Sequence, residues 1–159
     1  MAAKADFFNE IRTGNLEGIR KLLGDQPDFL NTVDDRGSTP LLLTTYYGHL
    51  EVAKFLLEQG AEVDAKDSSG NTALMGVCFK GFEDIAELLV KSGADVNHVN
   101  SMGATSLIYA ATFNKVGIAK LLLENGAIVD AKDARGNTAL DNAKMQEATE
   151  MVELLTQFG

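Results

Sequence analysis

The side chains of this 159-residue chain that could do chemistry are two histidines, one cysteine and four regularly spaced acidic or amide residues. Nucleophilic catalysis or metal binding needs several such groups at one place. His49 and His98 are far apart in the sequence, and no histidine is placed near Cys78 as a partner. The chain also has no glycine-rich phosphate-binding motif. The sequence therefore predicts no enzyme, no catalytic residue, no bound metal and no cofactor.

The acidic and amide residues belong to a repeat. They recur every 33 residues, at Asp34, Asp67, Asn100 and Asp133. Each stands three residues before a glycine of a parallel series, which is Gly37, Gly70, Gly103 and Gly136. Aspartate and asparagine side chains commonly accept hydrogen bonds from the backbone of their own turn. We therefore interpret these residues as turn formers and not as calcium ligands.

The residues that follow each glycine predict two helices per period. In the period that begins at residue 34, Thr39 is a good N-cap and Pro40 suits the first helical position. A short helix is expected to run to about residue 47, where Gly48 ends it. A second helix, with apolar residues at i, i+3 and i+4 spacing, is expected to end at Gly60 in a left-handed conformation.

This unit resembles the ankyrin repeat, whose period and Thr-Pro-Leu-His-x-Ala signature it shares in part. Thr39-Pro40-Leu41 matches the first three signature residues, and the other periods keep the threonine and the leucine. The resemblance covers nearly all of the chain and implies an all-α solenoid of helix-turn-helix units with β-turn or hairpin connections. We expect one domain over residues 1–159, with units at about 4–33, 34–66, 67–99, 100–132 and 133–159, of which the first and last are polar caps.

The chain departs from the family pattern at one position in every unit. The signature histidine is replaced, in turn, by Leu42, Met75, Ile108 and Asp141. In the family this imidazole hydrogen-bonds neighbouring units together, so we expect apolar contact to hold more of this stack. His49 occupies the family's Gly-His position, where histidine is usually structural. Cys78 aligns with Ala111 of the next unit, which predicts a packed and inert thiol.

Charge and composition exclude several partners. Fourteen lysines and arginines against 23 aspartates and glutamates give a formal net charge of −9. Such a field repels nucleic acid and anionic lipid surfaces. No apolar run has the length that a membrane span needs, and the first residues show no long apolar stretch like that of a signal peptide. The single cysteine suits a reducing compartment. We expect a monomeric cytoplasmic protein that binds neither nucleic acid nor membrane.

The resemblance also implies where a partner docks. Ankyrin repeat proteins usually bind partners on the concave side, which is made of turn tips and exposed residues of the first helices. By position, the candidate residues are Arg36, Tyr46, Tyr47, Ser69, Phe79, Lys80, Met102, Phe113 and Arg135. The aromatic members recur about one period apart, which predicts a single ridge of rings across units. Tyrosine and phenylalanine anchor many protein interfaces, although the alternative is that these rings pack between units.

The sequence therefore favours a non-catalytic interaction module, an adaptor, scaffold or inhibitor that binds a partner protein or peptide through its concave face. The identity of the partner does not follow from the fold. An alternative is an engineered or consensus-like repeat scaffold without a natural partner. Free variation among the units at Leu43, Gly76, Tyr109 and Asn142 favours the first interpretation.

Overall fold

The computed structural model describes residues 2–159, and all regular structure in this range is helical. The elements are α1 (Ala2–Thr13), α2 (Leu16–Asp25), a 3₁₀ helix η1 (Pro27–Asn31), α3 (Pro40–Tyr46), α4 (Leu50–Glu58), α5 (Ala73–Lys80), α6 (Glu83–Lys91), α7 (Ser106–Thr112), α8 (Val116–Glu124), α9 (Ala139–Met145) and α10 (Thr149–Phe158). No strand occurs between residues 2 and 159, so the all-α prediction is confirmed.

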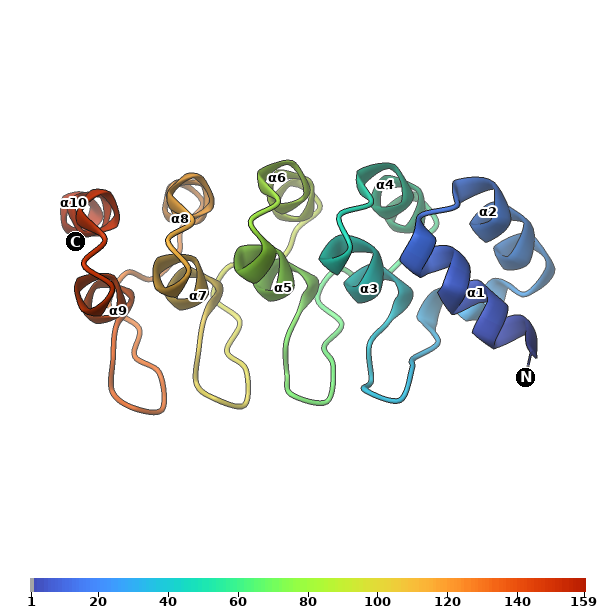
Figure 1. Cartoon of the computed structure of the whole chain (residues 1–159), viewed down its shortest axis with the longest axis horizontal. Coiled ribbons are helices and arrows are strands. Elements are labelled where there is room, and N and C mark those ends of the chain that lie inside the picture. Colours follow the sequence, from blue (N-terminus) through green and yellow to red (C-terminus); the bar gives the residue numbers. More distant parts are fainter. Residues whose placement is uncertain (1) are drawn as a thin grey trace.

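The helices form two layers in a single row (Figure 1). The odd-numbered helices pack side by side from α1 to α9, and the even-numbered helices from α4 to α10 pack in the second layer. The long turns that precede α3, α5, α7 and α9 all project from the odd-numbered layer, away from the even-numbered one. The two termini lie at opposite ends of the row, so each helix pair contacts only its neighbours, as in other solenoids.

Each odd-numbered helix from α3 to α9 begins after a threonine N-cap, as predicted for Thr39. The side-chain oxygens of Thr39, Thr72, Thr105 and Thr138 accept hydrogen bonds from the backbone N–H three residues later, at 3.1–3.5 Å. A cap of this kind stabilises a helix by about 1 kcal/mol. These helices are only seven or eight residues long, too short to be stable alone, so the caps help to define where each one starts.

The turns are held by the acidic and amide residues that open each unit. The Oδ1 atom of Asp34 accepts hydrogen bonds from the backbone N–H groups of Arg36 and Ser38, both at 2.9 Å. Asp67, Asn100 and Asp133 do the same in their own turns. This confirms the interpretation of these residues as turn formers. Successive turn tips are also joined by single backbone hydrogen bonds, Ser68 N–H to Arg36 O, Ser101 N–H to Ser69 O and Ala134 N–H to Met102 O, at 3.0–3.1 Å.

Between the two helices of a pair, the chain reverses through a residue with positive φ. Gly48 and Gly81 take φ values of 81° and 87°, which glycine adopts without strain. In the last two units the same position is occupied by Asn114 and Glu147, at φ values of 55° and 54°. Asparagine tolerates this left-handed region, but a glutamate there costs conformational energy.

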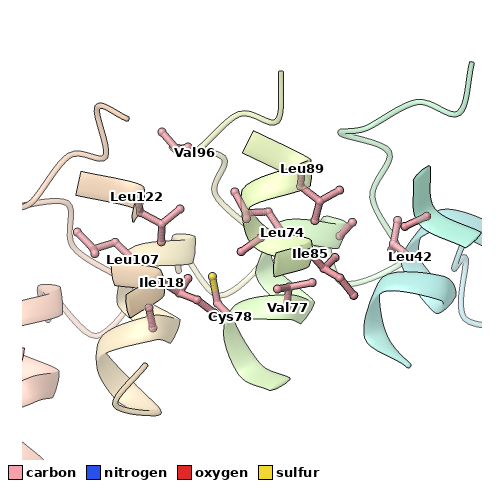
Figure 2. Packing of buried hydrophobic residues seen from close by; sticks show 14 of the residues in the cluster. Leu42, Leu74, Val77, Cys78, Ile85, Leu89, Val96, Leu107, Ile118 and Leu122 are labelled. Carbon is pink, nitrogen blue, oxygen red and sulfur yellow. The ribbon is translucent and has the colours of Figure 1, made fainter. Parts of the chain in front are cut away.

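A single apolar core runs through the stack. Figure 2 shows its middle part, where side chains of α5 and α6 such as Leu74 and Leu89 lie beside those of the next pair, such as Leu107 and Leu122. The residues that replace the signature histidine in the three middle units, Leu42, Met75 and Ile108, are buried in the stack. Thr44 of α3 is also fully buried, and its hydroxyl has no hydrogen-bond partner among the described residues.

Apolar contact does not hold the units alone. The Nε2 atom of His49 lies 2.8 Å from the carbonyl oxygen of Arg12, in the preceding unit. Within its own unit, the Nε2 atom of His98 lies 2.9 Å from the carbonyl oxygen of Gly70. The amide of Asn97 reaches the next unit, donating to Gly126 O and accepting from Ile128 N–H. The contacts of His49 and Asn97 connect units from positions other than that of the signature histidine, so polar contacts add to the apolar ones that hold the stack.

Candidate functional site

A groove follows the odd-numbered layer on the side of the projecting turns. Its volume is about 1010 Å³, which holds several side chains of a partner. Residues from α1, α3, α5 and α7 line it, together with the turns before α3 and α5. Charged, aromatic and small or apolar residues line it, among them Lys4, Arg12, Asp34, Asp35, Arg36, Leu43, Tyr46, Tyr47, Asp67, Met75, Gly76, Phe79, Tyr109 and Phe113.

Aromatic rings form a continuous row along this groove. Tyr46, Tyr47, Phe79 and Phe113 are each 38–45% exposed. The ring centroids of Tyr46 and Phe79 are 6.4 Å apart with parallel planes, and those of Phe79 and Phe113 are 4.7 Å apart, edge to face. Tyr47 adjoins Tyr46 at 5.8 Å. The rings contact one another across units and still expose a substantial part of their surface, which is unusual for large apolar side chains in one cluster.

The row continues into Tyr109, a residue that the sequence reasoning treated only as a variable position. Its ring centroid lies 6.3 Å from that of Phe113, one helical turn further on, and its hydroxyl accepts a hydrogen bond of 2.7 Å from the Asn100 amide. The hydroxyl is therefore fixed, and the ring completes the far wall of the groove. The signal that could have found it was the spacing of four residues between Tyr109 and Phe113, which places both aromatics on one helix face.

Gly76 leaves a hollow in the middle of the groove. It lies inside α5, at the position that Leu43 occupies in α3 and Tyr109 in α7. A methyl group at Gly76 would be 3.6 Å from the Tyr46 ring, an ordinary contact, so the backbone does not require glycine there. The missing side chain leaves space beside the Tyr46 ring, in a groove that Tyr109 also lines.

The helices that line the groove bring only positive charge to it. Lys4 and Arg12 line it from α1, and α3 and α7 carry no charged residue. The only charged residue of α5 is Lys80, whose Nζ lies 4.9 Å from the centroid of the Tyr46 ring. Within residues 2–159 the side-chain ion pairs are confined to the outer helices α4 and α6, so these three cations face the groove side without a carboxylate partner.

The negative charges of the groove belong to the turns. Asp34 and Asp67 line it, but each already accepts two backbone hydrogen bonds, which disperse its charge. Asp35 is exposed beside Arg36 in the sequence. The groove thus has an apolar aromatic floor, a positive helical side and a turn edge of mixed charge.

The structure brings five of the nine predicted site residues to this groove: Arg36, Tyr46, Tyr47, Phe79 and Phe113. Lys80 adjoins it through its contact with Tyr46. Ser69, Met102 and Arg135 are exposed at successive turn tips but do not line it. The groove extends instead toward the N-terminus, where α1 supplies Lys4 and Arg12, residues that the sequence reasoning assigned only to a cap.

The candidate chemical groups lie apart from the groove surface. Burial raises the pKa of the Cys78 thiol from 9.0 to about 12, and a hydrogen bond with Ser106 only partly opposes this. A thiol with so high a pKa is a poor nucleophile at neutral pH. Between residues 2 and 159 there is no cluster of three or more histidine, cysteine or acidic side chains able to hold a metal ion. In the same range, no helix has both the length and the apolar character needed to cross a membrane.

Comparison with known proteins identifies the family. A family model described as ankyrin repeats in three copies matches residues 7–100 and 92–159. The chain therefore belongs to the ankyrin repeat family. Repeats of this family generally mediate protein–protein interactions, and no catalytic family is indicated.

Similar curated proteins share only a segment with this chain. Ankyrin repeat and SAM domain-containing protein 6 of Mus musculus is 34% identical over 61 residues, which are 38% of this chain and 7% of that protein. Protein fem-1 homolog C of Danio rerio is 40% identical over 62 residues, 36% of this chain and 10% of that protein. Ankyrin repeat domain-containing protein 49 of Homo sapiens is 40% identical over 50 residues, 31% of this chain and 21% of that protein. The chain thus spans about a fifth or less of these relatives.

Proposed function

We propose that this protein is a non-catalytic interaction module that binds a partner protein or peptide on its concave side, through the aromatic groove. It acts as a monomer in the cytoplasm, and its partners are neither nucleic acids nor membranes. The observation that carries the proposal is the row of four partly exposed rings, Tyr47, Tyr46, Phe79 and Phe113, that contact one another along the groove.

The solvent exposure of these four rings favours a role in binding. An exposed aromatic ring leaves apolar surface in water, which costs about 25 cal/mol for each Å². Covering this surface with a partner recovers that free energy, and aromatic rings lose little conformational entropy when they are covered. Ser69, Lys80, Met102 and Arg135 extend the proposed surface beyond the groove, along the turn tips and the end of α5.

Affinity capture with a matched pair of variants tests the proposal. The test variant replaces Tyr46, Tyr47, Phe79 and Phe113 with alanine. The control variant replaces Ile128 and Phe158, which are exposed apolar residues outside the groove, with alanine. We expect wild type and control to retain the same partner in the native lysate and the test variant to lose it, with the helical circular dichroism signal unchanged in all three proteins.

A second variant keeps the test decisive if the fourfold alanine variant is unstable. Tyr47→Glu with Phe79→Glu places charge on two exposed side chains and leaves Tyr46 and Phe113 unchanged. Capture of the same partners by the wild type and by a folded form of either groove variant would refute binding through the aromatic row.

A further inference from the structure

The charges of the chain are distributed unequally between its two sides. The odd-numbered helices and the turns before them (residues 2–13, 32–46, 65–80, 98–112 and 131–145) contain eight cationic and seven acidic residues, a net charge of +1. The remaining residues contain six cationic and sixteen acidic residues, a net charge of −10. The overall acidity of the protein therefore comes from the even-numbered helices and the segments next to them, which form the outer side of the stack. A partner in the groove does not meet these charges directly.

Inside the groove, the positive charges lie where a partner could reach them. Lys4 and Arg12 are exposed on the groove face of α1, whereas Asp6 and Glu10 of the same helix do not line the groove. Lys80 is exposed beside the aromatic row. A carboxylate that approached from a partner would find cations without competing intramolecular ion pairs, and charge-assisted hydrogen bonds to them would be stronger than neutral ones.

Gly76 lines the same groove as the two cations of α1. A Cβ atom at this position would lie 3.6 Å from the Tyr46 ring, and Phe79, Tyr109, Met75 and Leu43 line the same groove. An apolar hollow with aromatic walls accepts a bulky apolar side chain, the arrangement that anchors many interfaces.

Resting on the proposed function, we infer that the groove recognises an acidic peptide segment that inserts one bulky apolar side chain over Gly76 and places carboxylates near Lys80 and the two cations of α1. Charge complementarity on the helical side of the groove selects this occupant over a basic segment, because the helices bring only positive charge to the groove, whereas its aspartates, Asp34, Asp35 and Asp67, lie on the turn edge. The acidic outer side repels the same segment, which directs it to the groove.

Selection from a phage-displayed library of random 12-residue peptides provides the test, with the full chain as bait. We expect the selected peptides to share a leucine or aromatic residue flanked by aspartate or glutamate. Gly76→Leu, which introduces the side chain that Leu43 carries at the equivalent position of the preceding unit, should weaken their binding at least tenfold. Lys4→Glu with Arg12→Glu should weaken binding by a similar factor, and the affinity for the wild type should fall as salt is added.

Two glycine variants separate binding from stability. Gly76→Ala improves the helix propensity of α5 and should raise Tm by about 2–4 °C while weakening peptide binding. Gly24→Ala makes the same change in α2, where a Cβ atom would meet nothing within 4 Å, and should raise Tm without changing binding.

Several results would overturn the inference. These are selected peptides that are basic or lack an apolar anchor, peptides that bind Gly76→Leu as tightly as wild type, and a library that yields no binder. Each would leave the proposed function standing if capture of a protein partner still depended on the four aromatic residues. A wild-type dimer in sedimentation that Gly76→Leu dissociates would instead assign the groove to a second copy of this chain.

Discussion

Replacement of Thr44 with valine should make the protein more stable. Thr44 lies in α3 with 0% of its surface exposed, and its hydroxyl oxygen has no hydrogen-bond partner. A buried polar group without a partner costs about 1–3 kcal/mol in desolvation. Valine has nearly the same shape and helix propensity as threonine but no hydroxyl. Val77 occupies the equivalent position of the next unit, also fully buried, so a side chain of this shape fits between inner helices.

We expect Thr44→Val to raise the free energy of unfolding by about 1 kcal/mol, the lower end of that range, because local relaxation already recovers part of the penalty in the wild type. In a domain of this size the corresponding rise in Tm is about 2–4 °C. The measurement is urea unfolding followed by circular dichroism, with the free energy obtained by linear extrapolation.

Thr45→Val is the matched control. Thr45 is the next residue of α3 and is equally buried, but its hydroxyl donates to the carbonyl oxygens of Leu41 and Leu42, at 2.9 and 3.1 Å. Loss of this hydrogen bond should lower the free energy of unfolding by about 1 kcal/mol. If the two variants shift stability in the same direction, or Thr44→Val is no more stable than wild type, the assigned cost of the unpaired hydroxyl is refuted.

Three further predictions concern single positions. Glu147→Gly should stabilise the protein by about 1 kcal/mol, because residue 147 has a φ of 54° that glycine adopts without strain; an unchanged urea midpoint would contradict this. Asn100→Asp should destabilise the protein by about 2 kcal/mol at pH 7. The buried Asn100 amide donates hydrogen bonds of 2.8 and 2.7 Å to the side chains of Asn71 and Tyr109, and a carboxylate has no N–H to donate. Asp133→Asn, in a turn where the side chain only accepts, should leave the free energy of unfolding nearly unchanged. The pKa of the Cys78 thiol is raised to about 12 in the folded protein, so the native thiol should resist Ellman's reagent at pH 8 until urea unfolds the chain. The contribution of the buried thiol to stability should be full below pH 9.0 and decline as pH rises toward 12. Rapid labelling of the native protein would show that the thiol is accessible.

Much of the fold could be predicted because the rules that position it act over three or four residues. The side chain of Thr39 caps the backbone N–H of Leu42, and Asp34 binds the backbone of Arg36 and Ser38. Contacts this local depend only on residue types at fixed spacings, and the 33-residue period repeats them in every unit.

Polar contacts between units were harder to predict. Asp and Asn serve equally well as turn formers, so the turn rule does not show why position 100 is an asparagine. The reason is that its amide donates to Asn71 and Tyr109, and these partners come together only in the folded stack. The contact of His49 with the carbonyl oxygen of Arg12 likewise joins residues of different units.

The groove could be predicted in part. The period placed Tyr46 and Phe79 on one face, because both lie in the regular part of the repeat. The α1 cations Lys4 and Arg12 were missed because the first unit lacks the glycine ladder, so positions could not be transferred to it from the other units. Gly76 was missed for a different reason, since a glycine contributes no side chain and its effect is space that only the neighbouring rings define.

Stability does not account for that glycine. A glycine inside a helix costs about 1 kcal/mol relative to alanine, and alanine at position 76 would make only an ordinary 3.6 Å contact with Tyr46. The stack is held by the buried core, by the turn-tip hydrogen bonds and by polar side chains such as Asn97, none of which needs a glycine at this position. What glycine does provide is open space beside the Tyr46 ring in the groove. A residue that lowers helix stability while shaping the floor of an exposed groove is what selection for binding would retain.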